Sequence, residues 1–294
     1  SKGVVVSGLD DDNVQEVILA INTFLNSDSM DIAQPKMIRQ GNDFAVNKLL
    51  SDLKKGTLKG LITAGLNPGY TLPNSKDFIN DLNKLELSVS FSTKEDETTS
   101  ACKFIGAIPH YLESWGDYEF KKGHFALAQP TIRPLFDTQQ FQDALLKLIN
   151  SDKNYYEEIK FYWKENILGR NLWNKSLHDG FLTTELSLNP NRKNIDVSSQ
   201  VDQLNSSNSR GLSLFLYTKT GMGDGRQANN PWLQEFPDPI SRISWDNYLT
   251  ISTIDAKKIG LENLTVANGA LNGSYAQVEA GDKKLIVPVL IQPG

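Results

Sequence analysis

One loop constrains the fold of this chain more than any other feature. Residues 65–74 read Gly-Leu-Asn-Pro-Gly-Tyr-Thr-Leu-Pro-Asn and follow directly on the apolar run 61–64. Glycine lets the backbone approach a ligand closely, and Pro68 biases Asn67 toward an extended conformation. A short buried strand that breaks into such a loop and restarts as a helix is how an α/β sheet builds a ligand-binding rim. Taken alone, the composition of the loop favours an ordinary strand-to-helix turn.

The first half of the chain alternates apolar strands with amphipathic helices. Strands are predicted over residues 4–7, 61–64, 87–91 and 104–108. Helices are predicted to begin after the acidic residues 10–12, at 42 or 43, at 75 and at 139. Strands separated by helices imply right-handed crossovers and a mainly parallel, Rossmann-like open sheet, with functional loops at the carboxyl ends of the strands. We therefore expect an α/β domain over residues 1–150.

The second half follows a different pattern. Residues 151–210 contain clustered aromatic residues and then an Asn- and Ser-rich stretch, which predicts a helical excursion followed by a linker or exposed loop. Residues 211–294 alternate short β-rich segments with Gly-rich turns, at 212–217, 264–266, 275–279 and 284–290. This pattern is typical of a small barrel. The predicted fold class is thus α/β, an open sheet followed by a partial double-psi β-barrel.

Composition excludes several classes of function. The 294 residues are 39% hydrophobic and carry a net charge of −5, which argues against nucleic acid as a partner. A single cysteine, Cys102, excludes an internal disulfide or a four-cysteine iron–sulfur site within this chain. No apolar run approaches the roughly 18 residues of a membrane span, so we expect no direct membrane span. Both ends look cut, which predicts a fragment of a longer protein.

Several motifs in a fixed order indicate a family. The chain reads HYLESWGD at 110–117, QPTIRPLFDT at 129–138 and NNPWLQEFPDPI at 229–240, all after the Asn-Pro loop. This series resembles the molybdopterin oxidoreductase superfamily. Within it, the chain is most similar to the large iron–sulfur/molybdopterin-like subunit of alternative complex III, a quinol:electron-acceptor oxidoreductase of Bacteroidetes-type bacteria.

The resemblance implies a cofactor site. In active relatives, the loops that match 65–70 and 92–97 hold one guanosine end of the molybdopterin guanine dinucleotide cofactor, and barrel residues near 229–231 approach the pterin. No catalytic or metal-ligating residue is expected in this chain. The cofactor-binding positions implied by the motifs are Gly65, Asn67, Pro68, Ser92, Glu97, Glu113, Gly116, Asn229 and Asn230.

One departure from the family pattern concerns the guanine site. Relatives that bind guanosine commonly have Asp soon after the strand that matches 87–91, where this chain has Ser92, Thr93 and Lys94. A lysine donates where an acceptor is needed. The metal ligand of active relatives lies in an earlier domain, and quinol-oxidising complexes of this branch keep the fold while lacking molybdenum. We therefore expect no cofactor in this fragment.

The sequence leaves three possible functions to be compared. The first is a fragment of a periplasmic quinol:electron-acceptor oxidoreductase subunit that serves as scaffold and docking surface and is not itself catalytic. Its partners would be the iron–sulfur, multihaem cytochrome and quinol-binding membrane subunits of a respiratory complex, with iron–sulfur clusters elsewhere in the parent protein. The second is a fragment of a true molybdenum oxidoreductase that binds the dinucleotide cofactor. The third, a small-molecule-binding α/β protein, is disfavoured because the second half lacks a further run of alternating strands and helices.

Other polar residues favour structural roles. The acidic run 95–97 predicts a solvated helix start, where carboxylates are favoured by the helix dipole. Glu113 is expected to accept backbone N–H bonds and fix its loop, and His110 and His124 to hydrogen-bond within the loop that closes the domain. The spacing of the histidines matches no metal-ligand pattern. Finally, residues 284–292 are predicted to leave an open strand edge through which the fragment self-associates.

Overall fold

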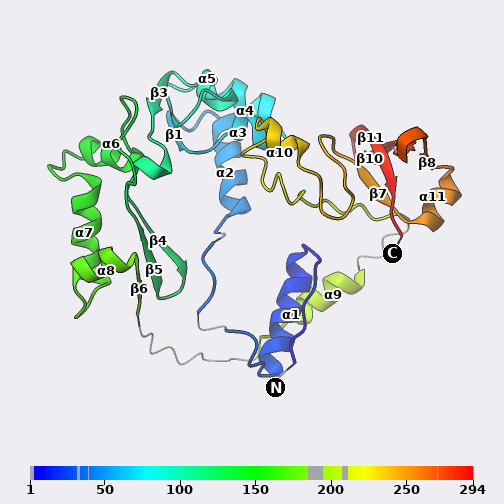
Figure 1. Cartoon of the computed structure of the whole chain (residues 1–294), viewed down its shortest axis with the longest axis horizontal. Coiled ribbons are helices and arrows are strands. Elements are labelled where there is room, and N and C mark those ends of the chain that lie inside the picture. Colours follow the sequence, from blue (N-terminus) through cyan, green and yellow to red (C-terminus); the bar gives the residue numbers. More distant parts are fainter. Residues whose placement is uncertain are drawn as a thin grey trace. The chain divides into compact units, whose positions relative to one another are not determined.

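The structure is a computed structural model that describes residues 3–31, 34–38, 40–184, 195–206, 211–269 and 271–293. The chain forms two units, Ser1–Leu212 and Ser213–Gly294 (Figure 1). None of the helices in the described residues is long and apolar enough to cross a membrane.

A parallel sheet carries the Asn-Pro loop. Its strands β1 (Gly60–Ala64), β2 (Leu87–Ser92) and β3 (Phe104–Ala107) lie in the order β1-β2-β3, and both strand pairs are parallel. These strands lie where the sequence predicts them. The sheet has three strands among the described residues, so the parallel part of the fold is smaller than predicted.

Helices pack against one face of this sheet. The helices of this region are α2 (Asp43–Lys54), α3 (Pro68–Thr71), α4 (Ser75–Leu82) and α5 (Glu97–Ala101). Leu53 of α2 and Phe78 and Leu82 of α4 form a buried apolar cluster with Leu85. The serines of β2 turn toward the helices, and Ser90 shares a buried hydrogen bond of 2.9 Å with Thr99 of α5. Helix packing and this polar contact together fix α5 beside the end of β2.

An antiparallel sheet follows that the sequence did not predict. Strands β4 (Gly116–Lys121), β5 (His124–Ala128) and β6 (Phe181–Thr183) form a sheet in the order β4-β5-β6. The short 3₁₀ helix η1 (Tyr111–Glu113) precedes it. The mainly parallel sheet expected over residues 1–150 is therefore a mixed arrangement, with one parallel and one antiparallel sheet.

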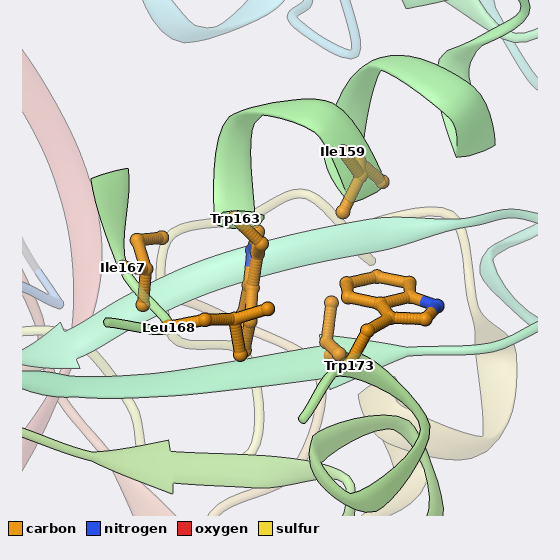
Figure 2. Packing of buried hydrophobic residues seen from close by; sticks show 6 residues of the cluster. Ile159, Trp163, Ile167, Leu168 and Trp173 are labelled. Carbon is orange, nitrogen blue, oxygen red and sulfur yellow. The ribbon is translucent and has the colours of Figure 1, made fainter. Parts of the chain in front are cut away.

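Three helices lie between β5 and β6 in the chain: α6 (Phe141–Leu148), α7 (Tyr155–Asn166) and α8 (Trp173–Asp179). Helix α6 lies where the sequence predicts a helix from residue 139, and α7 and α8 lie in the aromatic-rich region. Trp163 of α7 is fully buried, and its ring centroid lies 6.0 Å from that of Trp173 in an edge-on contact. Figure 2 shows the two indoles beside the strands, together with Ile159, Ile167 and Leu168 of the same cluster. The aromatic residues of this region therefore build a core.

The amino-terminal segment and the predicted linker differ from expectation. Helix α1 (Asp12–Phe24) is capped by Asp11, as the acidic residues predicted. Residues 3–11 contain no strand, because no strand pairs with them in the described part of the chain. Part of the predicted linker forms helix α9 (Ser198–Ser206), which contacts α1. The remainder of that predicted linker, at 187–194 and 207–209, lies outside the described residues.

The second unit contains strands but no barrel in its described residues. Strands β10 (Tyr275–Ala280), β11 (Lys283–Ile291) and β7 (Leu249–Ile251) form a three-stranded sheet in that order, and β8 (Asn263–Thr265) pairs with β9 (Leu271–Gly273) as a hairpin. Residues 212–217 form no strand, contrary to prediction, because nothing described pairs with them. The helices of the second unit among the described residues are α10 (Pro231–Glu235), α11 (Thr253–Ile259) and the short 3₁₀ helix η2 (Ala267–Gly269).

Strand β11 is central in its sheet. It pairs with β10 through residues 283–288 and with β7 through residues 289–291. The predicted open edge is therefore closed by β7 at residues 289–291, whereas residues 283–288 pair with β10 alone among the described residues, and self-association through this strand stays a prediction.

Candidate functional site

The Asn-Pro loop lies at the carboxyl end of β1, as predicted. Gly65 has a positive φ of 64°, a left-handed conformation that favours glycine, and its N–H donates to the Phe91 carbonyl at 2.8 Å. Asn67 occupies the N-cap position of α3, and Pro68 is the first helical residue, where its missing N–H costs nothing. The loop thus turns from strand to helix beside the end of β2.

A hydrogen-bond network joins this loop to α5. The Asn67 amide nitrogen donates to Glu97 Oε2 at 2.7 Å, and Asn67 Oδ1 accepts from the Thr98 hydroxyl at 2.8 Å and from its backbone N–H at 3.2 Å. The Thr98 hydroxyl also accepts from the Gly69 N–H at 2.8 Å. The hydrogen bond from the Asn67 side chain is the largest of the effects that hold the pKa of the Glu97 carboxyl below its usual range. Two loops that are far apart in sequence therefore satisfy each other's polar groups.

Gly69 is required by close packing. A Cβ at this position would lie 2.9 Å from Ile79 Cδ1 and 3.1 Å from Thr98 Oγ1. Thr98 itself is 0% exposed. The loop is consequently pressed against both α4 and α5, with little room for a larger residue.

The second rim loop is closed by its own contacts. The Ser92 hydroxyl donates to the Lys94 carbonyl at 2.8 Å. Asp96 caps α5 by accepting from the Thr99 N–H at 2.9 Å, and Glu97 lies in the first turn. The predicted acidic helix start is confirmed. Of the predicted cofactor residues, the fold therefore brings together Gly65, Asn67, Pro68, Ser92 and Glu97.

Glu113 and Gly116 belong to a neighbouring turn. Buried Glu113 accepts from the His110 N–H at 3.0 Å and from the Leu135 N–H at 3.3 Å, so it fixes the loop as expected. His110 completes a capping box with it. A Cβ at Gly116 would lie 2.7 Å from the Tyr118 hydroxyl. Both predicted residues have a structural explanation that requires no ligand.

The remaining predicted residues lie in the second unit. Asn230 caps α10 by accepting from the Trp232 N–H at 3.1 Å and the Leu233 N–H at 3.4 Å. Asn229 immediately precedes this cap. These two residues belong to the second unit, whereas the rim belongs to the first.

The sequence did not single out Thr98 or Asp117. The Thr98 hydroxyl makes two of the hydrogen bonds between the rim loops. The feature of the sequence that could have indicated this role is its position directly after Glu97 at the start of a helix.

Asp117 accepts hydrogen bonds from the Tyr155 hydroxyl at 3.0 Å and from the Trp163 indole N–H at 3.2 Å. Burial first, and then the Asp117 charge, raise the pKa of Tyr155. Asp117 satisfies the polar groups of an aromatic core.

A hollow of about 250 Å³ lies at the junction of β4 with α6 and α7. Its polar groups serve the fold: Asp143 accepts from the Tyr155 N–H at 2.7 Å, and the Gln140 amide bonds to the Trp115 N–H and C=O. The lining residues are Trp115, Gln140, Asp143, Asn154, Tyr155 and Tyr156.

The described residues contain no group of three or more His, Cys, Asp or Glu side chains arranged to hold a metal ion. His124 shares a hydrogen bond with Thr183 at 3.2 Å, and His178 one with Asp179 at 3.1 Å. His110 and His178 thus bond to nearby residues, whereas His124 bonds across the sheet from β5 to β6, so the expectation that His124 lies in a closing loop is wrong.

Part of the chain is similar in sequence to a known protein. No protein-family model matches the chain. A stretch of 94 residues, 31% of the chain, is 33% identical to the menaquinone reductase, molybdopterin-binding-like subunit of Nitratidesulfovibrio vulgaris. The matched stretch spans 14% of that relative's length. The chain is thus distantly and partially similar to a molybdopterin-binding-like subunit of a quinone reductase.

Proposed function

We propose that this chain is part of a subunit of a respiratory quinol:electron-acceptor oxidoreductase, in which it acts as scaffold and docking surface and binds no molybdenum cofactor. The observation that carries the proposal is the similarity to a molybdopterin-binding-like subunit of menaquinone reductase. The ordered motifs at 110–117, 129–138 and 229–240 support the finer assignment to the alternative complex III branch.

The chemistry of the rim supports the absence of a nucleotide cofactor. Both amide atoms of Asn67 and the Gly69 N–H are engaged by Glu97 and Thr98. A ligand would have to replace these bonds, and the buried groups left behind would each lose a partner. The Glu97 carboxylate also adds negative charge to the rim, which disfavours the anionic dinucleotide. The residues present therefore do not fit the guanine dinucleotide, and no step of the reaction is assigned to them.

The proposal places the subunit on the periplasmic side, attached through partner subunits that contain iron–sulfur clusters, multihaem cytochromes and a quinol site. Protease treatment of intact spheroplasts tests the side, since a periplasmic subunit is digested without lysis. Survival of the protein until lysis would overturn the periplasmic placement.

Purification of the tagged parent protein from its native membranes tests the assignment. We expect an assembly that contains haem and iron–sulfur subunits, oxidises a menaquinol analogue and carries no stoichiometric molybdenum by metal analysis. Molybdenum at one atom per subunit would instead support the true molybdenum enzyme. A protein that purifies alone, without quinol-dependent activity, would overturn the proposal.

A nucleotide titration tests the rim directly. We expect millimolar GDP to leave the melting temperature of the chain unchanged, because a ligand that binds only the folded state would raise it. A rise in melting temperature that shrinks in Asn67→Ala would show that the rim binds a guanine nucleotide and would refute the proposed vacancy of the cofactor site.

A further inference from the structure

The hollow beside β4 contains a carboxylate with one unused oxygen. Asp143 of α6 lines this hollow, and its Oδ1 accepts from the Tyr155 N–H at 2.7 Å. Its Oδ2 makes no hydrogen bond or ion pair with any of the described residues. An ionised carboxylate has about four acceptor sites on its two oxygens. The hollow therefore retains an acceptor that carries negative charge.

Aromatic rings form a wall of the same hollow. Trp115 and Tyr156 are half-buried, and their ring centroids lie 4.6 Å apart at an interplanar angle of 42°. The Gln140 side chain holds Trp115 in place, since it bonds to both the N–H and the C=O of that residue. The Lys160 ammonium lies 5.8 Å from the Tyr156 centroid, within the range of a cation–π contact. The wall is thus a fixed surface whose ring faces attract cations.

Size and charge limit what the hollow can bind. Its volume of about 250 Å³ is below the roughly 300–1,000 Å³ of pockets that take drug-sized ligands, so one side chain or a group of similar size fits. The Asp143 charge disfavours an anion, and a wholly apolar ligand would bury that charge without a partner. A small organic cation satisfies the carboxylate and packs on the rings.

The described part of the chain does not supply this cation to Asp143. Lys153, next to the lining residue Asn154, bonds to Glu158 at 3.2 Å, and its ammonium lies 3.7 Å from the centroid of Phe161. No described lysine or arginine forms an ion pair with Asp143. The partner of this carboxylate must therefore come from another molecule.

The groups around the hollow favour an arginine of a polypeptide. A planar guanidinium can stack on aromatic rings while it donates to a carboxylate, whereas an ammonium is a strongly hydrated point charge. The exposed Asn154 side-chain nitrogen donates to no described residue, so it can donate to a peptide carbonyl. An arginine within a polypeptide brings both the guanidinium and the carbonyl, and arginine is enriched at the centres of protein interfaces.

We propose that this hollow binds the guanidinium group of an arginine from a partner polypeptide, with Asp143 Oδ2 as acceptor and with Trp115 and Tyr156 as the surface on which the guanidinium packs. The assignment to a partner polypeptide rests on the docking role proposed above. The binding chemistry of the hollow is independent of that role, because it depends only on residues of the first unit.

Titration of the whole isotope-labelled chain with N-acetyl-arginine methylamide, followed by NMR, tests the site. We expect saturable shifts at the Trp115 indole N–H and at the Gln140 side-chain amide. N-acetyl-citrulline methylamide replaces the guanidinium with an uncharged urea of nearly the same shape, and it should bind at least about tenfold more weakly, since it loses a charge-assisted hydrogen bond. The corresponding lysine compound should also bind more weakly than the arginine compound.

Asp143→Asn tests the acceptor. This substitution removes the charge and keeps an oxygen for the Tyr155 N–H, and it should weaken the affinity for the arginine compound about tenfold or more. Asp152→Asn is the matched control, since Asp152 is exposed and does not line the hollow. It should leave the affinity unchanged.

Three results would refute the site: no saturable shift with the arginine compound, equal affinity for the citrulline or the lysine compound, or an equal loss of affinity in Asp143→Asn and Asp152→Asn. The comparison of the three compounds on the unaltered chain decides the matter even where a variant fails to fold.

The source of the arginine is tested in the parent assembly purified from native membranes. Asp143→Asn should lower the fraction of partner subunits that stays bound, and Asp152→Asn should not. Full retention of the partners in Asp143→Asn, while the unaltered chain binds the arginine compound, would overturn the assignment to a partner polypeptide. An assembly that forms although the titration fails would refute the site alone, whereas a parent protein that purifies without partners would refute the docking function.

Discussion

Thr98→Val isolates the polar contact between the two rim loops. Valine has nearly the shape of threonine but lacks the hydroxyl, which at position 98 donates to Asn67 Oδ1 at 2.8 Å and accepts from the Gly69 N–H at 2.8 Å. Thr98 is 0% exposed, so water cannot replace the lost bonds without a movement of the loop. Each bond contributes about 1 kcal/mol, and the stranded Gly69 donor adds a desolvation cost.

We therefore expect Thr98→Val to lower the free energy of unfolding of the first unit by about 2–3 kcal/mol. For a urea m-value of about 2 kcal/mol/M, this corresponds to a midpoint lower by about 1–1.5 M. Thr98→Ser is the matched control, since it keeps the hydroxyl and removes only a methyl group, at a cost of about 1 kcal/mol. The assay is urea unfolding followed by circular dichroism and by tryptophan fluorescence.

The comparison between the two substitutions decides the outcome. If Thr98→Val is no more destabilising than Thr98→Ser, the hydroxyl contributes little and the rim is held by packing alone. A changed m-value would indicate altered cooperativity, and the midpoint alone would then not measure stability.

Two further predictions concern packing and pH. Gly69→Ala should destabilise the first unit by about 1–3 kcal/mol because its Cβ would lie 3.1 Å from Thr98 Oγ1 and 3.2 Å from the Thr98 backbone nitrogen, which cannot move aside as the end of the Ile79 side chain can. Gly41→Ala, with open space around it, should have little effect, and equal unfolding midpoints would contradict this. The raised pKa of Tyr155 means that its stabilising contribution is complete below the unfolded value near 10 and is lost as pH rises through the higher folded value. Tyrosinate absorbance should show that Tyr155 resists ionisation above pH 10, as does Tyr248, whose pKa burial also raises. Asp117→Asn should make Tyr155 ionise earlier, and an unchanged titration would refute the role of the Asp117 charge.

The sequence alone determined those elements whose signals are local. The apolar run 61–64 and the β-branched and apolar run 87–91 became strands β1 and β2. Side-chain caps at Asp11 and Asn42 placed the starts of α1 and α2, because a cap needs only residues a few positions apart. The position of the rim loop at the end of β1 followed in the same way.

The hairpin at 116–128 was missed because its pattern is inverted. Asp117 faces the aromatic core, where it bonds to Tyr155 and Trp163, while Tyr118 and Phe120 on the opposite face are each 49% exposed. Alternation in sequence reads this strand with its polar side toward water. Only the packing of α7 against the sheet reverses that assignment.

Strands also need partners that the sequence does not name. Residues 4–7 and 212–217 have strand-like composition, yet neither is paired among the described residues, and the expected barrel does not form there. Strand composition measures how a residue fits a pleated surface, whereas a strand exists only where another backbone supplies its hydrogen bonds.

The contacts of the rim were likewise decided by tertiary structure. Asn67 and Glu97 were predicted separately as residues that face a ligand, but the fold points their side chains at each other at 2.7 Å, with Thr98 between the loops. Parallel pairing of β1 and β2 brings the ends of both strands to one edge, which is a consequence of the sheet and not of either loop. The sequence thus determined which residues line the rim, and the sheet decided that they bind one another, because buried polar groups take the nearest partner that the packed strands present.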